Sequence, residues 1–351
     1  MKRYFLPLLL VLTLTWVAIP TPAVAQTDSP QEDVPTGIVF GTIINRNNGN
    51  VVTENLEVML HVWDQEYIDL DMQHGQTNAD GTFKFSDVRL DPDRLYAVMT
   101  IFDGVTYFSE VFPGPADEYI NEIELVVPVI ETISDLEDVQ VDQLHLLFSF
   151  AEDGMETTEI YTLSNFGERT VKDAVTLESG QVATLGFPLP ADADYIFFQP
   201  NEKDHFIKFL GGFADAYPIL PGNSSDEFRV QYLVPYSSGR TYTYTAPVNV
   251  QTINFLIPEE AGVTLEGKGL SAVQPYSMQQ SETSYLLYYF ETIGAGETIE
   301  VTFKGQPIIT SNAATKNPNL PIVLGGAILG LTMVGVGFWW WWKPEEHKNQ
   351  Q

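Results

Sequence analysis

The sequence predicts an all-β protein, with antiparallel β-sandwiches in tandem and one C-terminal transmembrane helix. Three observations lead to this fold class. Short runs rich in β-branched and aromatic residues recur, and Gly, Pro, Asn and Asp separate them. A helical period is nearly absent from residues 37–305. A stretch of 22 residues near the C-terminus carries no charge.

Composition excludes several classes of function. The chain has 351 residues, of which 44% are hydrophobic, so it can bury a sizeable core. Its 17 basic and 47 acidic residues give a formal net charge of -30, which disfavours binding to nucleic acid or anionic lipid. Cysteine is absent, which excludes disulfides, zinc–thiolate sites and cysteine nucleophiles.

Residues 1–25 have the layout of a secretory signal peptide. Lys2 and Arg3 precede an apolar run over residues 6–19, and Ala23 and Ala25 form an A-x-A cleavage site before Gln26. An uncleaved anchor is the alternative, but the apolar run is short and a cleavage site follows it. We therefore expect cleavage, in a bacterial style of signal.

Residues 321–342 are predicted to cross a membrane. They contain no charged residue, and 22 residues of helix span about 33 Å at about 1.5 Å per residue. Gly326 and Gly330 have the GxxxG spacing that lets two helices approach, although glycine is common in membrane helices in any case. The stretch begins at Pro321 and ends in an aromatic belt formed by Trp339, Trp340, Trp341 and Trp342.

The two hydrophobic segments predict one topology. The N-terminal ectodomain lies outside the cytoplasm, and residues 343–351 form a short cytoplasmic tail with Lys343 and Lys348. Residues 26–36 are predicted to be a disordered leader and residues 306–320 a stalk. Without the signal peptide and the tail, 13 basic and 45 acidic residues remain, so the ectodomain has a net charge of -32.

The first predicted sandwich covers residues 37–132. In residues 56–63 apolar and mixed positions alternate, so Val58 and Leu60 face one side while Met59 and His61 face the other. Asp80 with Gly81, and Asp103 with Gly104, are placed in tight turns. The expected strands are residues 37–45, 56–63, 72–78, 82–85, 95–102, 105–112 and 123–130.

This region resembles the carboxypeptidase regulatory-like domain. The resemblance rests on an opening strand at residues 41–45, a T-x-x-D-G-x-F hairpin from Thr77 to Phe83, and a Y-x-V strand at Tyr96 to Val98. It covers about 95 of the 351 residues. The family is a seven-stranded, transthyretin-like β-sandwich and a non-catalytic accessory module, so the resemblance implies a fold and no chemistry.

The second predicted region covers residues 135–305 and suits either one large sandwich of the immunoglobulin or jelly-roll kind or two small ones. Phe228, Val230 and Tyr232 share one face of an alternating strand. The proline-containing runs at residues 187–190, 218–222 and 234–236 resemble bacterial extracytoplasmic proteins that accompany membrane-protein and cytochrome biogenesis. The expected strands are residues 143–150, 157–164, 182–187, 195–199, 228–234, 241–245, 250–257, 284–290 and 298–303.

Two M-x-H pairs make a candidate copper site. Met59 with His61 and Met72 with His74 lie on neighbouring predicted strands, and a period of two puts each pair on one face. Thioether and imidazole ligands suit copper. The alternative is that Met59 packs in the sandwich, His61 is half-exposed, and the other pair lies in a strand or loop.

Paired carboxylates near turns make a candidate calcium site, because oxygen ligands suit this ion. No EF-hand spacing is present, and 47 acidic residues produce such pairs by chance. The candidates are Asp69, Asp71, Asp91, Asp93, Asp192 and Asp194.

No catalytic motif is present. The sequence lacks a G-x-S-x-G elbow, an H-E-x-x-H helix and a P-loop, so it predicts neither an enzyme nor a cofactor. A group of late tyrosines could stack on sugars, form a protein-binding patch or fill the core: Tyr236, Tyr242, Tyr244, Tyr285, Tyr288 and Tyr289. We therefore expect a non-enzymatic, membrane-anchored binding or scaffolding protein with a protein partner at the membrane, and a homodimer through the helix as an option. A surface module for carbohydrate or a divalent cation is the alternative.

Overall fold

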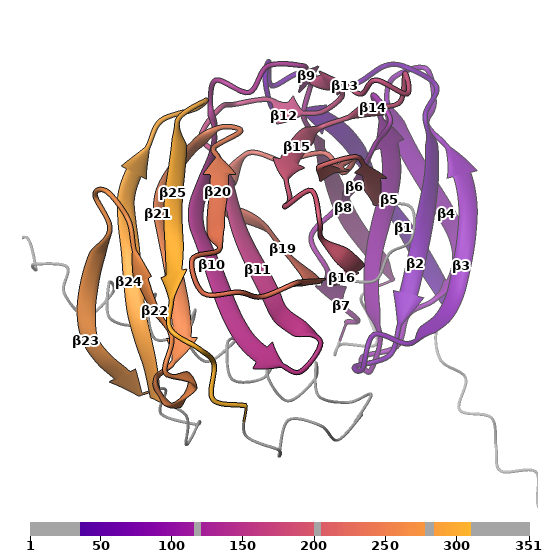
Figure 1. The fold of residues 1–351 in the computed structure, drawn as a ribbon. Helices are drawn as coiled ribbons and strands as arrows, with labels where there is room; N and C mark the ends of the chain where they lie inside the picture. The colour runs from indigo at the N-terminus through magenta and orange to yellow at the C-terminus, as the bar shows by residue number, and fades with distance from the viewer. Residues whose placement is uncertain (1–35, 116–120, 200–204, 278–283, 310–351) are drawn as a thin grey trace, which may run out of the picture.

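The computed structural model describes residues 36–115, 121–199, 205–277 and 284–309, and this part of the chain is nearly all β. It contains no α-helix there, only one 3₁₀ turn at Glu259–Ala261. Figure 1 shows two β-sandwiches side by side, the first in indigo and purple and the second from magenta to yellow. The all-β prediction is confirmed.

The first sandwich packs a three-stranded sheet on a larger one. The small sheet has the order β4-β1-β8, and the large sheet has the order β3-β2-β5-β6, with β7 also paired to β5. The strands are β1 (Thr36–Asn45), β2 (Glu57–Trp63), β3 (Asp69–Gln76), β4 (Thr82–Arg89), β5 (Leu95–Phe102), β6 (Val105–Phe108), β7 (Phe112–Pro113) and β8 (Glu122–Val129).

Alternation along β2 decides which side chains enter this core. Val58, Leu60 and Val62 are buried between the sheets, while Met59 and His61 lie on the outer face. Each fully buried aliphatic side chain stabilises the fold by about 1.5–3 kcal/mol. The core also takes Phe83 and Phe85 from the hairpin strand β4, and their rings lie 6.1 Å apart.

The second sandwich is built on one seven-stranded sheet of order β16-β19-β11-β10-β21-β24-β23. Its strands are β10 (Val139–Ala151), β11 (Gly154–Asn165), β16 (Asp194–Gln199), β19 (Gly222–Val234), β21 (Asn249–Pro258), β23 (Ser271–Ser277) and β24 (Ser284–Ile293).

Two three-stranded sheets cover the inner face of this large sheet. One has the order β15-β18-β17, formed by β15 (Leu185–Pro188), β17 (Phe206–Phe209) and β18 (Gly212–Asp215). The other has the order β20-β25-β22, formed by β20 (Thr241–Thr245), β22 (Thr264–Glu266) and β25 (Thr298–Lys304). Ring contacts join the layers, such as Tyr161 with Phe187 at 4.7 Å and Phe148 with Phe303 at 5.0 Å. One continuous core results, with members from Val139 to Phe303.

The prediction of purely antiparallel sheets is wrong at three pairs. β1 runs parallel to β8 over eight residue pairs, and β10 runs parallel to β21. The short strands β9 (Thr132–Ile133) and β12 (Thr170–Val171) also pair in parallel. Parallel neighbours need long crossover connections, which here pass through the rest of each sandwich, so local turn signals could not reveal them.

Several predicted features lie outside the described residues. These are the signal peptide with Ala23 and Ala25, residues 26–35 of the leader, most of the stalk, the cytoplasmic tail and the helix at residues 321–342. Among the residues that the structure describes, no helix is long and apolar enough to cross a membrane.

Candidate functional site

The outer face of the β3-β2-β5-β6 sheet brings the four copper candidates together. In the antiparallel pair β2–β3, Met59 lies opposite His74 and His61 lies opposite Met72. Directly opposed side chains share one face, with Cβ atoms about 4.5–5.5 Å apart. The two M-x-H pairs therefore form one two-by-two block, which we call the Met/His block.

Further soft and aromatic side chains surround the Met/His block. Met99 of β5 lies opposite Met59, and Phe108 of β6 lies opposite Met99. The His61 ring stacks on Trp63 with centroids 5.2 Å apart, and lies 6.0 Å from the ring of Phe108. Ala97 of β5 lies opposite His61 on the other side of β2 from Met72, and its side chain is small.

Each histidine of the block has a carboxylate beside its Nδ1 atom. Glu57 Oε1 lies 3.2 Å from Nδ1 of His74, and Asp69 Oδ1 lies 3.6 Å from Nδ1 of His61. The His61 side chain is only 13% exposed, and neither of its ring nitrogens has a hydrogen-bond partner among the described residues. His74 is well exposed at the rim.

The structure does not gather the calcium candidates. Asp69 and Asp71 lie on β3, Asp91 and Asp93 precede β5, and the remaining pair lies at the edge of the second sandwich. Within the described part of the chain, no group of three or more His, Asp or Glu side chains is arranged to hold a metal ion.

Most of these aspartates already have partners. Asp192 receives two hydrogen bonds from Arg240, of 2.8 and 2.7 Å, and these lower the pKa of Asp192. Asp91 lies 3.6 Å from both Arg89 and Arg94. Asp194 Oδ1 accepts a hydrogen bond from the backbone of Tyr195, and Asp93 N donates to Asp91.

The two predicted turns lie at ends of strands in this sheet, one between β5 and β6 and one between β3 and β4. Asp103 and Gly104 have φ values of 51° and 74°, and they join β5 to β6 in the manner of a two-residue hairpin loop. Asp80 Oδ1 accepts hydrogen bonds from the backbone and the hydroxyl of Thr82, which lower the pKa of Asp80. Gly81 follows with a φ of 78°.

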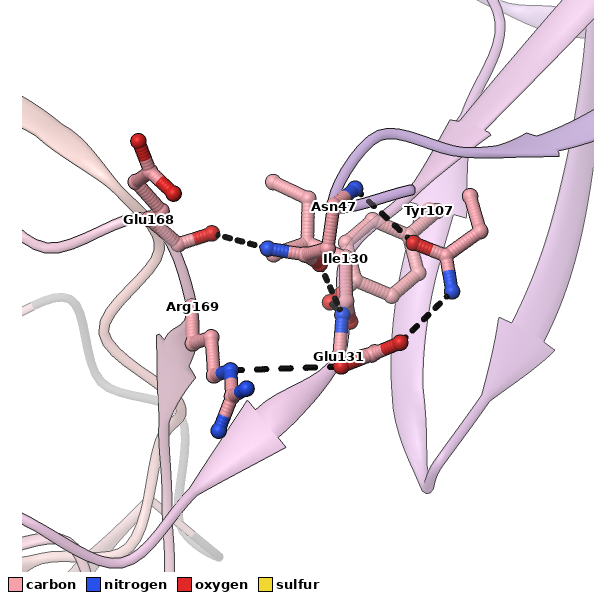
Figure 2. Close-up of polar contacts among 7 residues, drawn as sticks. Asn47, Tyr107, Ile130, Glu131, Glu168 and Arg169 are labelled. Carbon is pink, nitrogen blue, oxygen red and sulfur yellow. Dashed lines mark hydrogen bonds and ion pairs between the residues drawn. The ribbon is translucent and has the colours of Figure 1, made fainter. Parts of the chain in front are cut away.

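Polar contacts lock the two sandwiches together, a feature that the sequence did not reveal. Asn47 Nδ2 donates to the carbonyl of Glu168 at 2.7 Å, and Asn47 Oδ1 accepts from the backbone of Glu131 at 2.7 Å. Glu131 also accepts from Asn45 and lies 3.9 Å from Arg169 (Figure 2). Asn47 thus bridges the first sandwich, the connecting segment and the second sandwich.

Tyr107 makes the buried part of this junction. Its hydroxyl donates to the carbonyl of Ile130 at 2.8 Å and lies 2.9 Å from the hydroxyl of Thr170. At the other end of the connection, Lys172 Nζ donates to the carbonyl of Asp103. The connection itself is paired as β9 with β12, so it is not a free linker.

The second sandwich encloses a carboxylate that the sequence analysis missed. Glu159 of β11 is fully buried, and the hydroxyls of Tyr161, Tyr232 and Tyr242 donate to it at 2.6, 2.6 and 2.8 Å. Burial raises the pKa of Glu159, and the three hydrogen bonds oppose that rise. We call these four residues the Glu159 cage. In the sequence, the signal for this site was that Glu159 occupies an inward-facing position of an alternating strand.

Each of the six late tyrosines is buried or half-buried, and Tyr288 and Tyr289 belong to the half-buried ones. Tyr242 and Tyr244 are buried in the second sandwich, and Tyr285 is buried beside Leu256. Tyr236 is half-buried, and its hydroxyl donates to the carbonyl of Gly305. They do not form an exposed stacking platform for a sugar.

Another buried acid, Asp215, lies beside a histidine. Asp215 Oδ1 lies 3.5 Å from Nδ1 of His205, and both residues are buried. Burial raises the pKa of Asp215 well above its ordinary value. The His205 ring packs against Tyr217 and Phe206, with ring centroids 4.3 and 4.8 Å apart.

Three surface hollows in the described part of the chain have carboxylates among the residues that line each of them. They measure about 390, 560 and 520 Å³ and lie at the junction, over β1 with β4, and beside Arg240. None of the three is lined by a histidine. These hollows therefore do not join an imidazole to a carboxylate.

No family model and no curated protein matches the chain. The resemblance to the carboxypeptidase regulatory-like domain therefore remains a prediction.

Solved structures show only distant similarity. A candidate protease from Parabacteroides distasonis is 10% identical over 47% of this chain and 40% of its own length, with a TM-score of 0.22. BcpA, the major pilin subunit of Bacillus cereus, is 10% identical over 80% and 91%, with a TM-score of 0.19. A candidate adhesin from Bacteroides ovatus is 14% identical over 62% and 74%, with a TM-score of 0.21. The chain spans less than half of that protease, and TM-scores this low carry no argument about function.

Proposed function

We propose that this protein is a non-enzymatic binding or scaffolding protein of the bacterial envelope. One C-terminal helix holds it at the membrane, with its sandwiches outside the cytoplasm, where it is accessory to a membrane protein or to envelope assembly. The observation that carries the proposal is the exposed apolar outer face of the β3-β2-β5-β6 sheet. We call it the apolar face. Its exposed members in the sheet are Leu70, Met72, Ile101 and Phe108, and we include Tyr67 and Ile68 of the adjoining β2–β3 loop.

Large apolar side chains gathered on one surface of a soluble domain are typical of a protein-binding site. Here Ile101 and Phe108 come from the neighbouring strands β5 and β6. The rings of Tyr67 and Trp63 are in contact, with centroids 6.2 Å apart. The opposite side of the same sheet is closed by the core. The outer side has no covering layer among the described residues.

Charge defines the partner that would fit this face. Exposed acidic side chains of the β2–β3 loop and of β3 border it, among them Glu66, Asp69 and Asp71. Like charges across an interface are costly, and opposite charges steer association. The partner is therefore a protein with an apolar patch bordered by lysine or arginine.

The junction gives the apolar face a fixed direction relative to the second sandwich. Asn47, Tyr107 and Lys172 connect the sandwiches at three separate points. A scaffold benefits from such a connection because an ordered arm loses less conformational entropy on binding than a flexible one.

The strand arrangement supports the proposed family of the first sandwich. Two sheets enclose one core, and the Thr77 to Phe83 segment forms the tight connection from β3 to β4. We propose the same transthyretin-like class for it, and an immunoglobulin-like or jelly-roll-like class for the second sandwich.

Affinity capture of full-length protein from gently solubilised membranes of the native host tests this function. We expect a stoichiometric membrane protein in the eluate, identified by mass spectrometry. The double variant Ile101→Asp/Phe108→Asp should lose it, because two charges would be buried in the interface. Val182→Asp, at an exposed valine of the second sandwich, should retain it.

Two results would contradict the proposal. One is the absence of any stoichiometric partner in several detergents. The other is an equal yield of partner with the double variant, provided that circular dichroism shows the variant to be folded.

A further inference from the structure

We propose that the Met/His block binds one monovalent copper ion, Cu(I), through His61, His74, Met59 and Met72. This inference goes beyond the proposed function and does not depend on it. The ion would be held by the Nε2 atoms of the two histidines and the Sδ atoms of the two methionines.

Register places the four donor residues next to one another on one face. The cross-strand pairs Met59–His74 and His61–Met72 are adjacent, so like residues occupy the diagonals of the block. Diagonal neighbours on one face lie about 7–8 Å apart at the backbone, within reach of long side chains. Thioether and imidazole groups that extend from the four corners can therefore meet above the centre.

The imidazole of His61 makes no hydrogen bond among the described residues. Its ring is largely covered by its neighbours. A buried unsatisfied polar atom is costly and is uncommon in native proteins. A metal ion bound at Nε2 would supply the missing interaction.

The carboxylates complete the pattern of a metal site. A metal-bound histidine almost always gives its other ring N–H to a carboxylate, a carbonyl or water, which fixes the tautomer and the ring orientation. Glu57 lies beside Nδ1 of His74 and Asp69 lies beside Nδ1 of His61. In both histidines the carboxylate lies beside Nδ1, so we assign Nε2 as the atom that binds the ion.

The donor set selects the ion. Two thioethers and two imidazoles are soft to intermediate ligands, which suit Cu(I), whereas Ca²⁺ and Mg²⁺ require oxygen ligands. Trp63 and Phe108 shield one side of the block from water. Exposed Met72 and His74 leave the other side open for the ion to enter.

The test is an anaerobic Cu(I) titration of the full-length chain in detergent, in competition with a chromophoric Cu(I) chelator. We expect one Cu(I) per chain. The variant Met59→Leu/Met72→Leu should bind at least about 100-fold more weakly, since even outer partners of a metal site change affinity by about 10–100-fold. X-ray absorption at the copper edge should show both sulfur and nitrogen neighbours.

Matched variants distinguish the loss of a copper ligand from a general effect of substitution on the fold. Met155→Leu removes a thioether that is buried in the second sandwich and should leave Cu(I) affinity unchanged. His74→Asn changes an exposed side chain, so it should fold normally and still lose affinity. Glu57→Gln should weaken binding by about 10-fold through His74.

Three results would overturn the proposal. They are no retention of Cu(I) against the chelator, equal affinity in Met59→Leu/Met72→Leu and Met155→Leu, or a copper edge without sulfur neighbours. Because leucine is also apolar, Met59→Leu/Met72→Leu should still capture the protein partner. Loss of copper binding can therefore be distinguished from loss of partner binding.

Discussion

Tyr242 of β20 donates a hydrogen bond of 2.8 Å to Glu159 of β11, and this bond joins the two layers of the second sandwich through the core. Tyr232 donates to the same oxygen, Oε1, and Tyr161 donates to Oε2 of this carboxylate. The Glu159 cage is therefore a satisfied polar centre inside an apolar core. Such centres stabilise one arrangement of layers, because any shift leaves buried groups without partners.

Replacement of Glu159 should reveal the dependence of this centre on pH. Burial raises the folded-state pKa of Glu159 above its ordinary value of 4.5, so the folded chain holds this proton more tightly than the unfolded chain. The free energy of unfolding should therefore fall as pH rises from about 4.5 through the folded-state pKa. Glu159→Gln should remove this contribution. Urea unfolding of both proteins at several pH values measures it.

An exposed carboxylate provides the control for this measurement. Glu124→Gln, on β8, should leave the pH dependence of unfolding close to that of the wild type. Glu159→Ala should lose about 3 kcal/mol or more at any pH, because three buried hydroxyls lose their acceptor. Identical pH profiles for wild type and Glu159→Gln would contradict the raised pKa.

Tyr107→Phe should loosen the junction between the sandwiches. It removes one hydroxyl that contacts both Ile130 and Thr170, at a cost of about 1–2 kcal/mol. The chain has no cysteine, so spin labels can be attached at Lys84→Cys and Lys268→Cys alone. We expect a broader distance distribution between the labels in Tyr107→Phe by pulsed electron spin resonance.

Tyr96→Phe is the matched control for the junction. The Tyr96 hydroxyl also makes two hydrogen bonds, to the carbonyl of Arg89 and from the backbone of Asp91, both inside the first sandwich. This variant should lose similar stability with no change in the distance distribution. Equal broadening in both variants would show that Tyr107 has no special role at the junction.

Gly81→Ala should destabilise the first sandwich more than Gly49→Ala does. Both glycines have a positive φ, 78° and 74°, which costs an alanine about 1–3 kcal/mol. At Gly81 a Cβ atom would also lie 2.4 Å from the carbonyl oxygen of Val52, whereas at Gly49 it would meet nothing within 4 Å. Thermal unfolding of the two variants, side by side, gives the comparison. A smaller loss for Gly81→Ala would contradict the close approach.

The predicted signal peptide and membrane helix give a separate prediction about processing and localisation. The mature chain should begin at Gln26, because Ala23 and Ala25 form the cleavage site. Intact mass of the protein purified from native membranes measures this directly. Protease added outside the cytoplasmic membrane should remove the sandwiches, and a chain ending at residue 309 should be released. Retention of the signal segment would indicate an uncleaved anchor instead.

Local periodicity predicted much of the first sandwich. The strand at residues 95–102 was predicted with the bounds that β5 has, and alternation placed Val58 and Leu60 on the buried side of β2. These features depend only on neighbouring residues, because a period of two fixes which face a side chain joins. Short strands such as β9 and β12 have no such period and were missed.

The sequence by itself determined that the part of the chain described by the structure is nearly all β, and it placed Met59 with His61 and Met72 with His74 as same-face pairs. Only the tertiary structure decided that His74 lies opposite Met59, and that β1 and β10 each pair in parallel with distant strands. It also decided that three tyrosines from separate strands meet at Glu159. The reason is physical: a face depends on adjacent residues, whereas register and convergence depend on the packing of the whole chain.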